Sequence, residues 1–390
     1  MQKPHLVITP SVPLWRDGEP LIFDRKFYDG VSFYLNKWPG DVSCIMSLDK
    51  SNPPDFGLVK KTQNELRFRC TVLDENELIG ISHLDGASIV LAAGDSFDQL
   101  HVSQLCKTIN TKCVYIIENI PETRYQIASL STKNPVIKFR RFINIWNGER
   151  KRLKAFSLSD GLQINGTAAY DEYKKFENQI LYFDTRVNKN LIINEESLQD
   201  RLSYLSQNKP LRLAFSGRLI RMKGADHLIK MMRRLKQRNI NAHLTIYGAG
   251  DLEDEMKAYI HKHQLADSVF MVGSVDFYKE LIPVLKQQVD LFVMLHRQSD
   301  PSCTYLEALS CGLPIVGYEN KAFSGLLELS DIGWGAKSDD IDGVVKIIER
   351  LNVNRARIAE KSKTSRKFAG QHDFETTFQN RIDHLYHLIK

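Results

Sequence analysis

A short basic turn bounded by glycines follows an apolar stretch in the second half of the chain. It reads Gly217-Arg218-Leu219-Ile220-Arg221-Met222-Lys223-Gly224 and comes directly after residues 212–216. Glycine lets the backbone approach a ligand, the first amides of the following helix are unpaired, and Arg218 and Lys223 would flank a phosphate. Basic residues in a turn are more often simply solvated, so the turn alone is moderate evidence for a diphosphate site.

A carboxylate inside a small-residue helix is the second candidate. Asp300-Pro301-Ser302 precedes the helix, which contains Glu307 and ends at Gly312. Pro301 suits a helix start and Ser302 can cap helix amides. A carboxylate there can accept two vicinal ribose hydroxyls, although an isolated glutamate more often lies on a solvated face.

Short apolar strands alternate with amphipathic helices from Leu211 onward, which predicts a parallel sheet covered on both faces. The helix after the basic turn has one apolar face at three- and four-residue spacing. The predicted strands are 212–216, 243–247, 269–272, 290–295 and 314–318, and the helical face is made by Ala225, Leu228, Ile229, Met232 and Leu235.

The first half repeats this alternation less regularly, so we predict an α/β fold with two Rossmann-like domains. Strands are expected at 5–9, 42–47, 88–92, 113–118, 161–164 and 180–183, with a helix at 23–37. The predicted domains are 1–187 and 211–369, joined by a polar linker at 188–210, and a helix at 370–390 returns to the first domain. Ligands of such proteins bind at the carboxyl ends of the strands, which places the site in a central cleft between the domains.

Composition supports two soluble domains. The chain has 390 residues, 43% of them hydrophobic and 26% charged, which is enough for two cores. The first residues include an apolar run too short for a signal peptide, so we expect a cytoplasmic protein. The six cysteines lack the spacing of zinc sites and are expected to be reduced, mostly buried thiols.

Four segments in this order resemble the retaining GT-B glycosyltransferases of family 4, also called group 1. Residues 217–224 look like the phosphate-binding turn of that family, and Glu307-Ala308-Leu309-Ser310-Cys311-Gly312-Leu313-Pro314 looks like its most specific segment. The other two are the glycine-rich turn with Gly248 and Gly250 and the base-side loop Gly273-Ser274-Val275. The resemblance is strong over 211–316.

The resemblance implies a hexosyltransferase-type enzyme that moves a sugar from a UDP- or GDP-sugar to a saccharide or lipid-linked saccharide acceptor. The anomeric configuration would be retained, and no metal or other cofactor would be needed. Arg218 and Lys223 would stabilise the departing diphosphate, and Glu307 would hold the ribose. The residues implied to bind the donor are Gly217, Gly248, Gly250, Gly273, Ser274, Val275, Ser299, Asp300, Ser302, Cys303 and Thr304. Polysaccharide or glycan biosynthesis is the expected setting.

Two positions depart from the family pattern. The family has a glutamate eight residues before the second one, and here that position is Ser299, with Asp300 beside it. A strand that often ends in histidine ends here in Glu118-Asn119, and Asp95 follows another strand. Asp95 and Glu118 are therefore candidates for acceptor or donor-sugar contacts, although each is more often an ordinary loop acid. A nucleotide-sugar-binding subunit without turnover is the alternative function.

The segment 133–154 contains eight Lys or Arg and one Glu, interleaved with Phe139, Phe142, Ile145 and Trp146. Such a helix can lie on an anionic membrane, at its inner face in this case, where a lipid-linked acceptor would be found. The favoured interpretation is an ordinary helix whose aromatic residues face the first core. No nucleic-acid-binding motif accompanies the basic residues, so no nucleic acid partner is expected.

Overall fold

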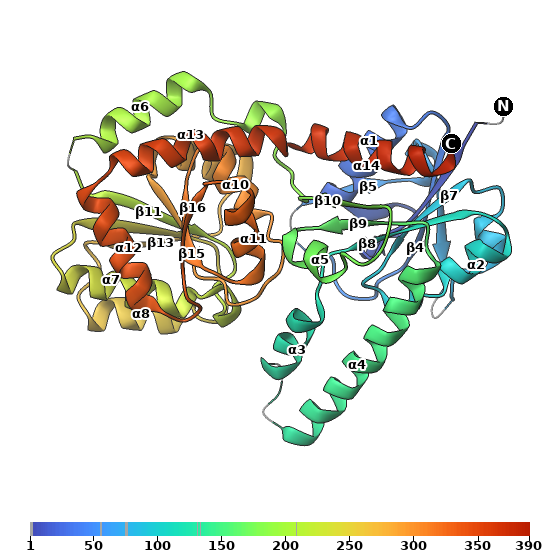
Figure 1. The fold of residues 1–390 in the computed structure, drawn as a ribbon, viewed down its shortest axis with the longest axis horizontal. Helices are drawn as coiled ribbons and strands as arrows, with labels where there is room; N and C mark the ends of the chain where they lie inside the picture. The colour runs from blue at the N-terminus through green and yellow to red at the C-terminus, as the bar shows by residue number, and fades with distance from the viewer. Residues whose placement is uncertain (1–2, 55–56, 75–76, 131, 133, 208) are drawn as a thin grey trace. The chain divides into compact units, whose positions relative to one another are not determined.

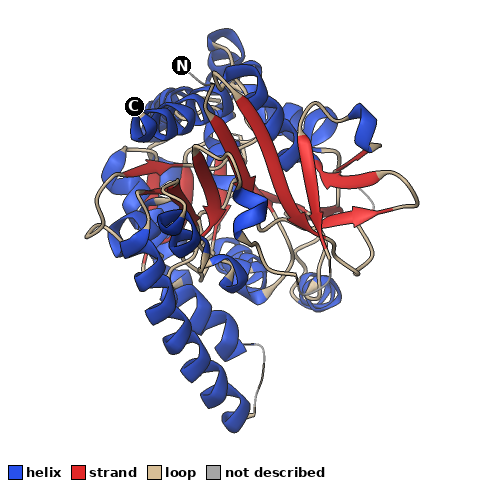
Figure 2. Ribbon diagram, turned by 90° about the vertical axis from the view of Figure 1, so that its right-hand side faces the viewer, coloured by secondary structure: helices blue, strands red, loops and turns tan. Residues whose placement is uncertain are grey.

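The computed structural model describes residues 3–54, 57–74, 77–130, 132, 134–207 and 209–390. Within these residues the chain forms two compact units, each built around a parallel sheet (Figures 1 and 2). The first unit comprises Met1–Tyr182 and Thr376–Lys390, and the second comprises Phe183–Glu375. This division differs from the predicted boundaries by a few residues at each junction, and the predicted linker falls inside the second unit.

The described part of the first unit has a seven-stranded sheet in which neighbouring strands are parallel. Strand order runs one way from β1 to β4 and β6, and the other way from β1 to β7, β8, β9 and β10, so it reverses between β1 and β7. The bounds, in sheet order, are Gln179–Tyr182 (β10), Gly161–Asn165 (β9), Lys112–Ile117 (β8), Ile89–Ala93 (β7), His5–Thr9 (β1), Asp41–Ser47 (β4) and Arg69–Leu73 (β6).

A small antiparallel sheet, with two strands before the first helix and one after it, was not predicted. It consists of Leu14–Arg16 (β2), Leu21–Asp24 (β3) and Leu58–Lys61 (β5). The predicted helix at 23–37 was therefore wrong at its start, because Phe23 belongs to β3. Helix α1 (Arg25–Lys37) begins after Asp24, whose side chain accepts the Phe27 amide at 3.0 Å as an N-cap.

The remaining helices of the first unit include a pair, α3 and α4, that projects from the sheet as a hairpin (Figure 1). The turn Gly166, with φ of 84°, joins β9 to α5. The bounds are Phe97–Gln99 (η3), Val102–Thr108 (α2), Pro121–Leu130 (α3), Pro135–Leu158 (α4) and Thr167–Glu172 (α5), with short 3₁₀ turns at Gln63–Glu65 (η1) and Ile81–Leu84 (η2).

Helix α14 (Phe374–Ile389) carries the chain back to the first unit, as predicted for the C-terminal helix. The Phe378 ring lies 5.8 Å from the ring of Tyr34 in α1, and Ile382 and Leu385 are buried. Nε of Arg381 donates to the side-chain Oε1 of Gln163 at 2.8 Å, and the side-chain Nε2 of Gln163 donates to the backbone carbonyl of Arg381 at 2.9 Å. The apolar face of this helix thus completes the first core.

The second unit has a six-stranded parallel sheet over its described residues. Strand order runs from β11 to β12 and β13 on one side and from β14 to β15 and β16 on the other, so it reverses between β11 and β14. Ligands of doubly wound sheets bind at such a reversal. The bounds, in sheet order, are Val269–Gly273 (β13), Ala242–Tyr247 (β12), Leu211–Ser216 (β11), Leu291–Met294 (β14), Ile315–Tyr318 (β15) and Gly333–Ala336 (β16).

Amphipathic helices cover this second sheet. The predicted apolar face of α7 is confirmed, because all five of its residues are buried in the core. The bounds are Lys189–Leu191 (η4), Glu195–Leu205 (α6), Arg221–Lys223 (η5), Ala225–Gln237 (α7), Glu253–Lys262 (α8), the π-turn Phe277–Leu281 (η6), Ile282–Gln288 (α9), Thr304–Ser310 (α10), Lys321–Leu329 (α11), Ile341–Val353 (α12) and Ala356–Gln371 (α13).

Helix α6 lies in the segment predicted as a linker and is tied into the second unit. The buried guanidinium of Arg201 donates to the carbonyl oxygens of Cys311 at 2.5 Å and Gly312 at 2.6 Å. These carbonyls follow α10, so Arg201 satisfies the end of that helix. The segment 188–207 therefore packs as part of the second unit.

Two further properties bear on function. All six cysteines are free thiols, and five of them are buried, as predicted. None of the helices formed by the described residues offers a stretch long and apolar enough to span a bilayer.

Candidate functional site

The turn after β11 is fixed by close backbone contacts at the carboxyl edge of the second sheet. Gly217 donates its amide to Tyr247 at 3.0 Å, and Leu219 donates to Ala249 at 2.9 Å, so the turns after β11 and β12 are joined. Gly224 has φ of 69°, and a Cβ there would lie 2.0 Å from the Leu295 carbonyl oxygen. Only glycine fits this position, because the loop after β14 crosses directly above it.

Lys223 ends the turn and points into the protein. Its side chain is only 10% exposed, and its ammonium lies 3.0 Å from Oδ2 of Asp300. The second carboxylate oxygen of Asp300, Oδ1, is buried and has no hydrogen-bond partner among the described residues. An ammonium has three donors, so Lys223 can hold Asp300 and still donate to an anion.

Arg218 is exposed at the start of the same turn. Within the described residues its guanidinium makes no ion pair or side-chain hydrogen bond, whereas Arg221, three residues on, donates to Glu255 at 2.8 Å. Of the two basic residues predicted to flank a phosphate, one is thus buried and paired and the other is exposed and free to bind an anion.

A histidine that was not predicted from the sequence lies in the loop after β14, near Lys223. His296 follows β14, is 1% exposed, and neither ring nitrogen has a hydrogen-bond partner among the described residues. Burial, together with the nearby charge of Lys223, holds the pKa of the imidazole well below its usual value. A histidine directly after a buried strand was the available sequence signal, since strand ends of this type carry ligand-facing residues.

Ser299 occupies the position where the family pattern has its first glutamate. It is 3% exposed, and its hydroxyl accepts the amide of Lys321 at 3.1 Å, at the start of α11. The serine is therefore engaged within the protein. Asp300, beside it, supplies the carboxylate of this loop.

Glu307 lies in the first turn of α10 and is 5% exposed. Its Oε1 accepts from Nε of Arg186 at 2.8 Å. The Arg186 guanidinium also stacks over the Phe277 ring, 3.5 Å from its centre, in a cation–π contact. Arg186 was missed by the sequence analysis, because no local pattern connects it with Glu307.

The other residues expected to bind a donor line the same edge of the second sheet. Gly273 ends β13 and accepts the Gly248 amide at 2.7 Å, so a third turn joins the first two. Ser302 donates its amide to the Asp300 carbonyl at 2.9 Å. All of these residues are half-buried or exposed: Gly248, Gly250, Gly273, Ser274, Val275, Ser302, Cys303 and Thr304.

The two carboxylates suggested in the first half belong to the first unit. Asp95 accepts the amides of Glu118 at 2.8 Å and Asn119 at 3.1 Å, and it pairs with Arg124. Its carboxylate is thus engaged in joining the ends of β7 and β8. Glu118 accepts from the Asn165 amide at 3.4 Å.

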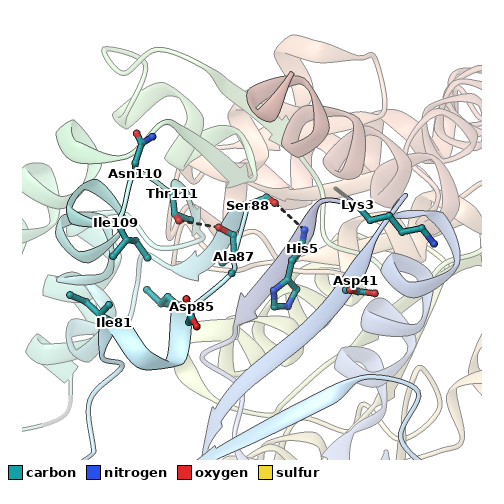
Figure 3. Close-up of a pocket in the computed structure, with 12 residues that line it drawn as sticks. Lys3, His5, Asp41, Ile81, Asp85, Ala87, Ser88, Ile109, Asn110 and Thr111 are labelled. Atoms are coloured by element: carbon teal, nitrogen blue, oxygen red, sulfur yellow. Dashed lines mark hydrogen bonds between the residues drawn. The ribbon is translucent and has the colours of Figure 1, made fainter. Parts of the chain in front are cut away.

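A depression of about 600 Å³ lies at the opposite edge of the first sheet. Figure 3 shows His5 and Ser88 on its wall, where the His5 amide donates to the Ser88 hydroxyl at 3.1 Å. Asp41 and Lys3 also line it, and none of the predicted site residues does. This hollow is therefore separate from the candidate site.

No group of three or more His, Cys, Asp or Glu residues within the described ranges has the arrangement of a metal site. The candidate site is instead a row of glycine turns with one exposed and one buried cation, placed where the strand order reverses. Such an arrangement suits an anionic ligand such as a diphosphate.

Comparisons with known proteins show what the second half of the chain is similar to. Residues 197–368 match the family model of glycosyl transferases group 1. This part of the chain is thus similar to a group 1 glycosyl transferase domain. The matched residues include the predicted phosphate turn, the glycine-rich turn and Glu307.

Curated relatives of the domain are also glycosyltransferases. The chain is 31% identical over 163 residues to the amylovoran biosynthesis glycosyltransferase AmsK of Erwinia amylovora, a match that covers 39% of this chain and 38% of AmsK. It is 24% identical over 341 residues to an uncharacterized glycosyltransferase of Methanocaldococcus jannaschii, covering 82% of this chain and 75% of that protein. The region matched in AmsK is thus well under half of each chain.

The fold is shared over nearly the whole chain. Anabaena HepE, solved in complex with UDP, superposes with a TM-score of 0.66 at 13% identity and covers 98% of both chains. The predicted GT-B class, with two Rossmann-like sheets, is therefore confirmed. The placement of the glycosyl transferase site in a cleft between the two units stays a prediction.

Proposed function

We propose that this chain is a glycosyltransferase that moves a sugar from a UDP- or GDP-sugar to a saccharide or lipid-linked saccharide acceptor. The proposal includes retention of the anomeric configuration, as in family 4, and catalysis without a metal or other cofactor. Polysaccharide or glycan biosynthesis in the cytoplasm is the proposed setting, which the six free thiols support. AmsK is named for amylovoran biosynthesis, and HepE was solved with UDP.

The observation that carries the proposal is the pair of cations in the turn after β11. Arg218 is exposed without a partner, and Lys223 lies at the other end of the turn with donors to spare. A diphosphate held between them would have its charge neutralised from two sides. The similarity of residues 197–368 to group 1 glycosyl transferases supports a nucleotide diphosphate as the ligand.

Transfer breaks the bond between the anomeric carbon and the phosphate oxygen, and the electron pair leaves with the diphosphate. The acceptor hydroxyl oxygen forms the new bond to the anomeric carbon from the same face, and its proton passes to the departing phosphate oxygen. Cations aimed at the departing diphosphate act most strongly as its charge grows, so their role is electrostatic. Arg218 and Lys223 are therefore proposed to stabilise the departing diphosphate.

Glu307 is proposed to bind the ribose of the donor. Among its described contacts, Oε1 holds Arg186, which leaves Oε2 for a ribose hydroxyl. The hydrogen bond from Arg186 orients the buried carboxylate.

Nucleotide binding and release test this function together. UDP or GDP at saturating concentration should raise the melting temperature, because a ligand at 100 times its dissociation constant adds about 2.7 kcal/mol. Slow release of free nucleotide from the matching nucleotide sugar should follow. No stabilisation by either nucleotide would refute the proposed donor site.

One observation favours the alternative of a binding subunit without turnover. Ser299 replaces the glutamate of the family pattern, and its hydroxyl is engaged with Lys321. Stabilisation by a nucleotide sugar, with no nucleotide released across many acceptors, would favour this alternative over the enzyme.

A further inference from the structure

Helix α4 presents an apolar stripe to solvent. Val136, Phe139, Ile143 and Trp146 recur at three- and four-residue spacing, which places them on one face of the helix. They are 74%, 67%, 43% and 54% exposed, respectively. The expectation that Phe139 and Trp146 face the first core was therefore wrong. Phe142 and Ile145 are partly buried, and Lys133 lies outside the described residues.

The opposite face of α4 anchors the helix to the first unit. Arg152 is fully buried and donates to the Gly94 carbonyl at 2.8 Å and to Glu149 at 2.8 Å. Glu149 also accepts from Arg124 of α3 at 3.1 Å. The Phe142 ring lies 5.1 Å from Tyr125, which joins the two helices of the hairpin nearer its tip. The stripe is thus held on a fixed, projecting hairpin (Figures 1 and 2).

The helix that carries the stripe is strongly basic. Helix α4 contains seven Lys or Arg and one Glu, an excess equal to the formal +6 of the whole chain. The single acid, Glu149, pairs inward with Arg124 and Arg152. Arg140, Lys151 and Lys154 are exposed, and Arg150 stacks over the Trp146 ring at 4.9 Å. The surface that α4 offers to a partner is therefore apolar along its centre and cationic beside it.

We propose that this stripe binds the surface of an anionic lipid bilayer, with Phe139 and Trp146 inserted at the headgroup level. Helices that lie in a membrane interface combine aromatic and aliphatic residues on one face with Lys and Arg beside them. Each cation near an anionic surface strengthens binding by about fivefold. Trp146, with Arg150 stacked on it, suits the boundary between headgroups and acyl chains, because the indole ring is apolar except for its N–H group.

The charges favour lipid over protein as the occupant. Protein interfaces are depleted of charged residues at their cores, whereas here exposed cations lie beside the stripe at Arg140 and just beyond its end at Arg150, Lys151 and Lys154. A second copy of the same stripe would bring like charges together, which opposes a dimer through this face. The proposal is independent of the donor site, because α4 belongs to the first unit and the turn at 217–224 to the second.

Vesicle binding by the full chain tests the proposal. The protein should sediment with vesicles of mixed phosphatidylcholine and phosphatidylglycerol and should bind pure phosphatidylcholine much more weakly. Added salt should weaken binding, since it screens the attraction of the cations. Tryptophan emission should shift to shorter wavelength on binding, and the shift should be absent in Trp146→Phe, since Trp15 and Trp38 are buried and the half-buried Trp334 belongs to the second unit.

Variants of the stripe test whether this surface, and not another part of the chain, binds the vesicles. Phe139→Glu combined with Ile143→Glu should abolish binding to the anionic vesicles. Arg140→Gln combined with Lys151→Gln should weaken it about 25-fold, from the loss of two cations. Val353→Glu, at a position 85% exposed in α12, is the matched control and should bind as wild type. All these positions are exposed, so unchanged melting temperatures are expected.

Three results would overturn the proposal. The first is no binding to anionic vesicles by the folded wild-type protein. The second is equal binding by wild type and the Phe139→Glu, Ile143→Glu variant. The third is a wild-type dimer in sedimentation equilibrium that the same variant converts to monomer, because the stripe would then be covered by a second copy.

Discussion

Replacing Arg218 by alanine gives the sharpest test of the donor site. The guanidinium is exposed and makes no ion pair or side-chain hydrogen bond within the described residues, so the variant should change the free energy of unfolding by less than about 0.5 kcal/mol. If Arg218 stabilises the departing diphosphate, its loss should cost about 3 to 4 kcal/mol in the transition state, or roughly a hundred- to a thousandfold in kcat. KM should rise much less than kcat falls, because the charge on the leaving group grows during the reaction.

Arg221→Ala is the matched control for this measurement. It removes the same charge from the same turn, but its guanidinium is engaged with Glu255 and Asp226. Steady-state kinetics with the donor found by thermal shift should show near wild-type turnover for Arg221→Ala and the large loss only for Arg218→Ala. Equal turnover in the two variants would refute the assignment of Arg218 to the diphosphate.

Three other changes probe the metal requirement, His296 and α6. Activity should survive EDTA, and complete loss restored by manganese would contradict the metal-independent mechanism. The pKa of His296 is lowered in the folded protein, so the unfolded state binds the proton first as pH falls. The free energy of unfolding should then decrease below about pH 6.5, by ~1.4 kcal/mol per pH unit from this residue. Denaturant titrations of His296→Gln should show a shallower decrease, and an unchanged slope would count against a buried neutral imidazole. Arg201→Met should lower stability by about 2 to 5 kcal/mol, because the buried carbonyls of Cys311 and Gly312 lose their donor. A melting temperature equal to wild type would show that α6 is not essential to the second unit.

Local sequence patterns were sufficient for the main elements of both sheets. Apolar strands bounded by turns located β11, β12 and β13, and the spacing of Leu228, Ile229 and Met232 located the buried face of α7. The antiparallel sheet of β2, β3 and β5 was missed because its strands are three or four residues long and pair across intervening elements. Helix α6 was missed because its sequence is polar and its main anchor, Arg201, contacts carbonyls about a hundred residues away.

The candidate site was predictable only where its residues are neighbours in the sequence. The glycine turn with Arg218 and Lys223 is a local motif. The pairs Lys223–Asp300 and Arg186–Glu307 join residues 77 and 121 positions apart, and no spacing rule connects them. The prediction for α4 failed for a different reason. This helix has apolar residues on two faces, and periodicity cannot tell which face is buried.

The first unit is built from two separated stretches of the sequence, and this affects how it folds during synthesis. Its core requires Phe378, Ile382 and Leu385 of α14, yet the 193 residues of the second unit, 183–375, are translated in between. At about 5 to 20 residues per second, the groove that receives α14 stays open for roughly 10 to 40 s after Tyr182 has been added. Once residue 375 has left the ribosome the second unit is complete, whereas the first still lacks α14 and cannot close its core. A ribosome-bound chain in which an unstructured linker replaces α14 after residue 375 should therefore be protease-resistant in the second unit and sensitive in the first, which reverses the usual N-terminal-first order of domain folding.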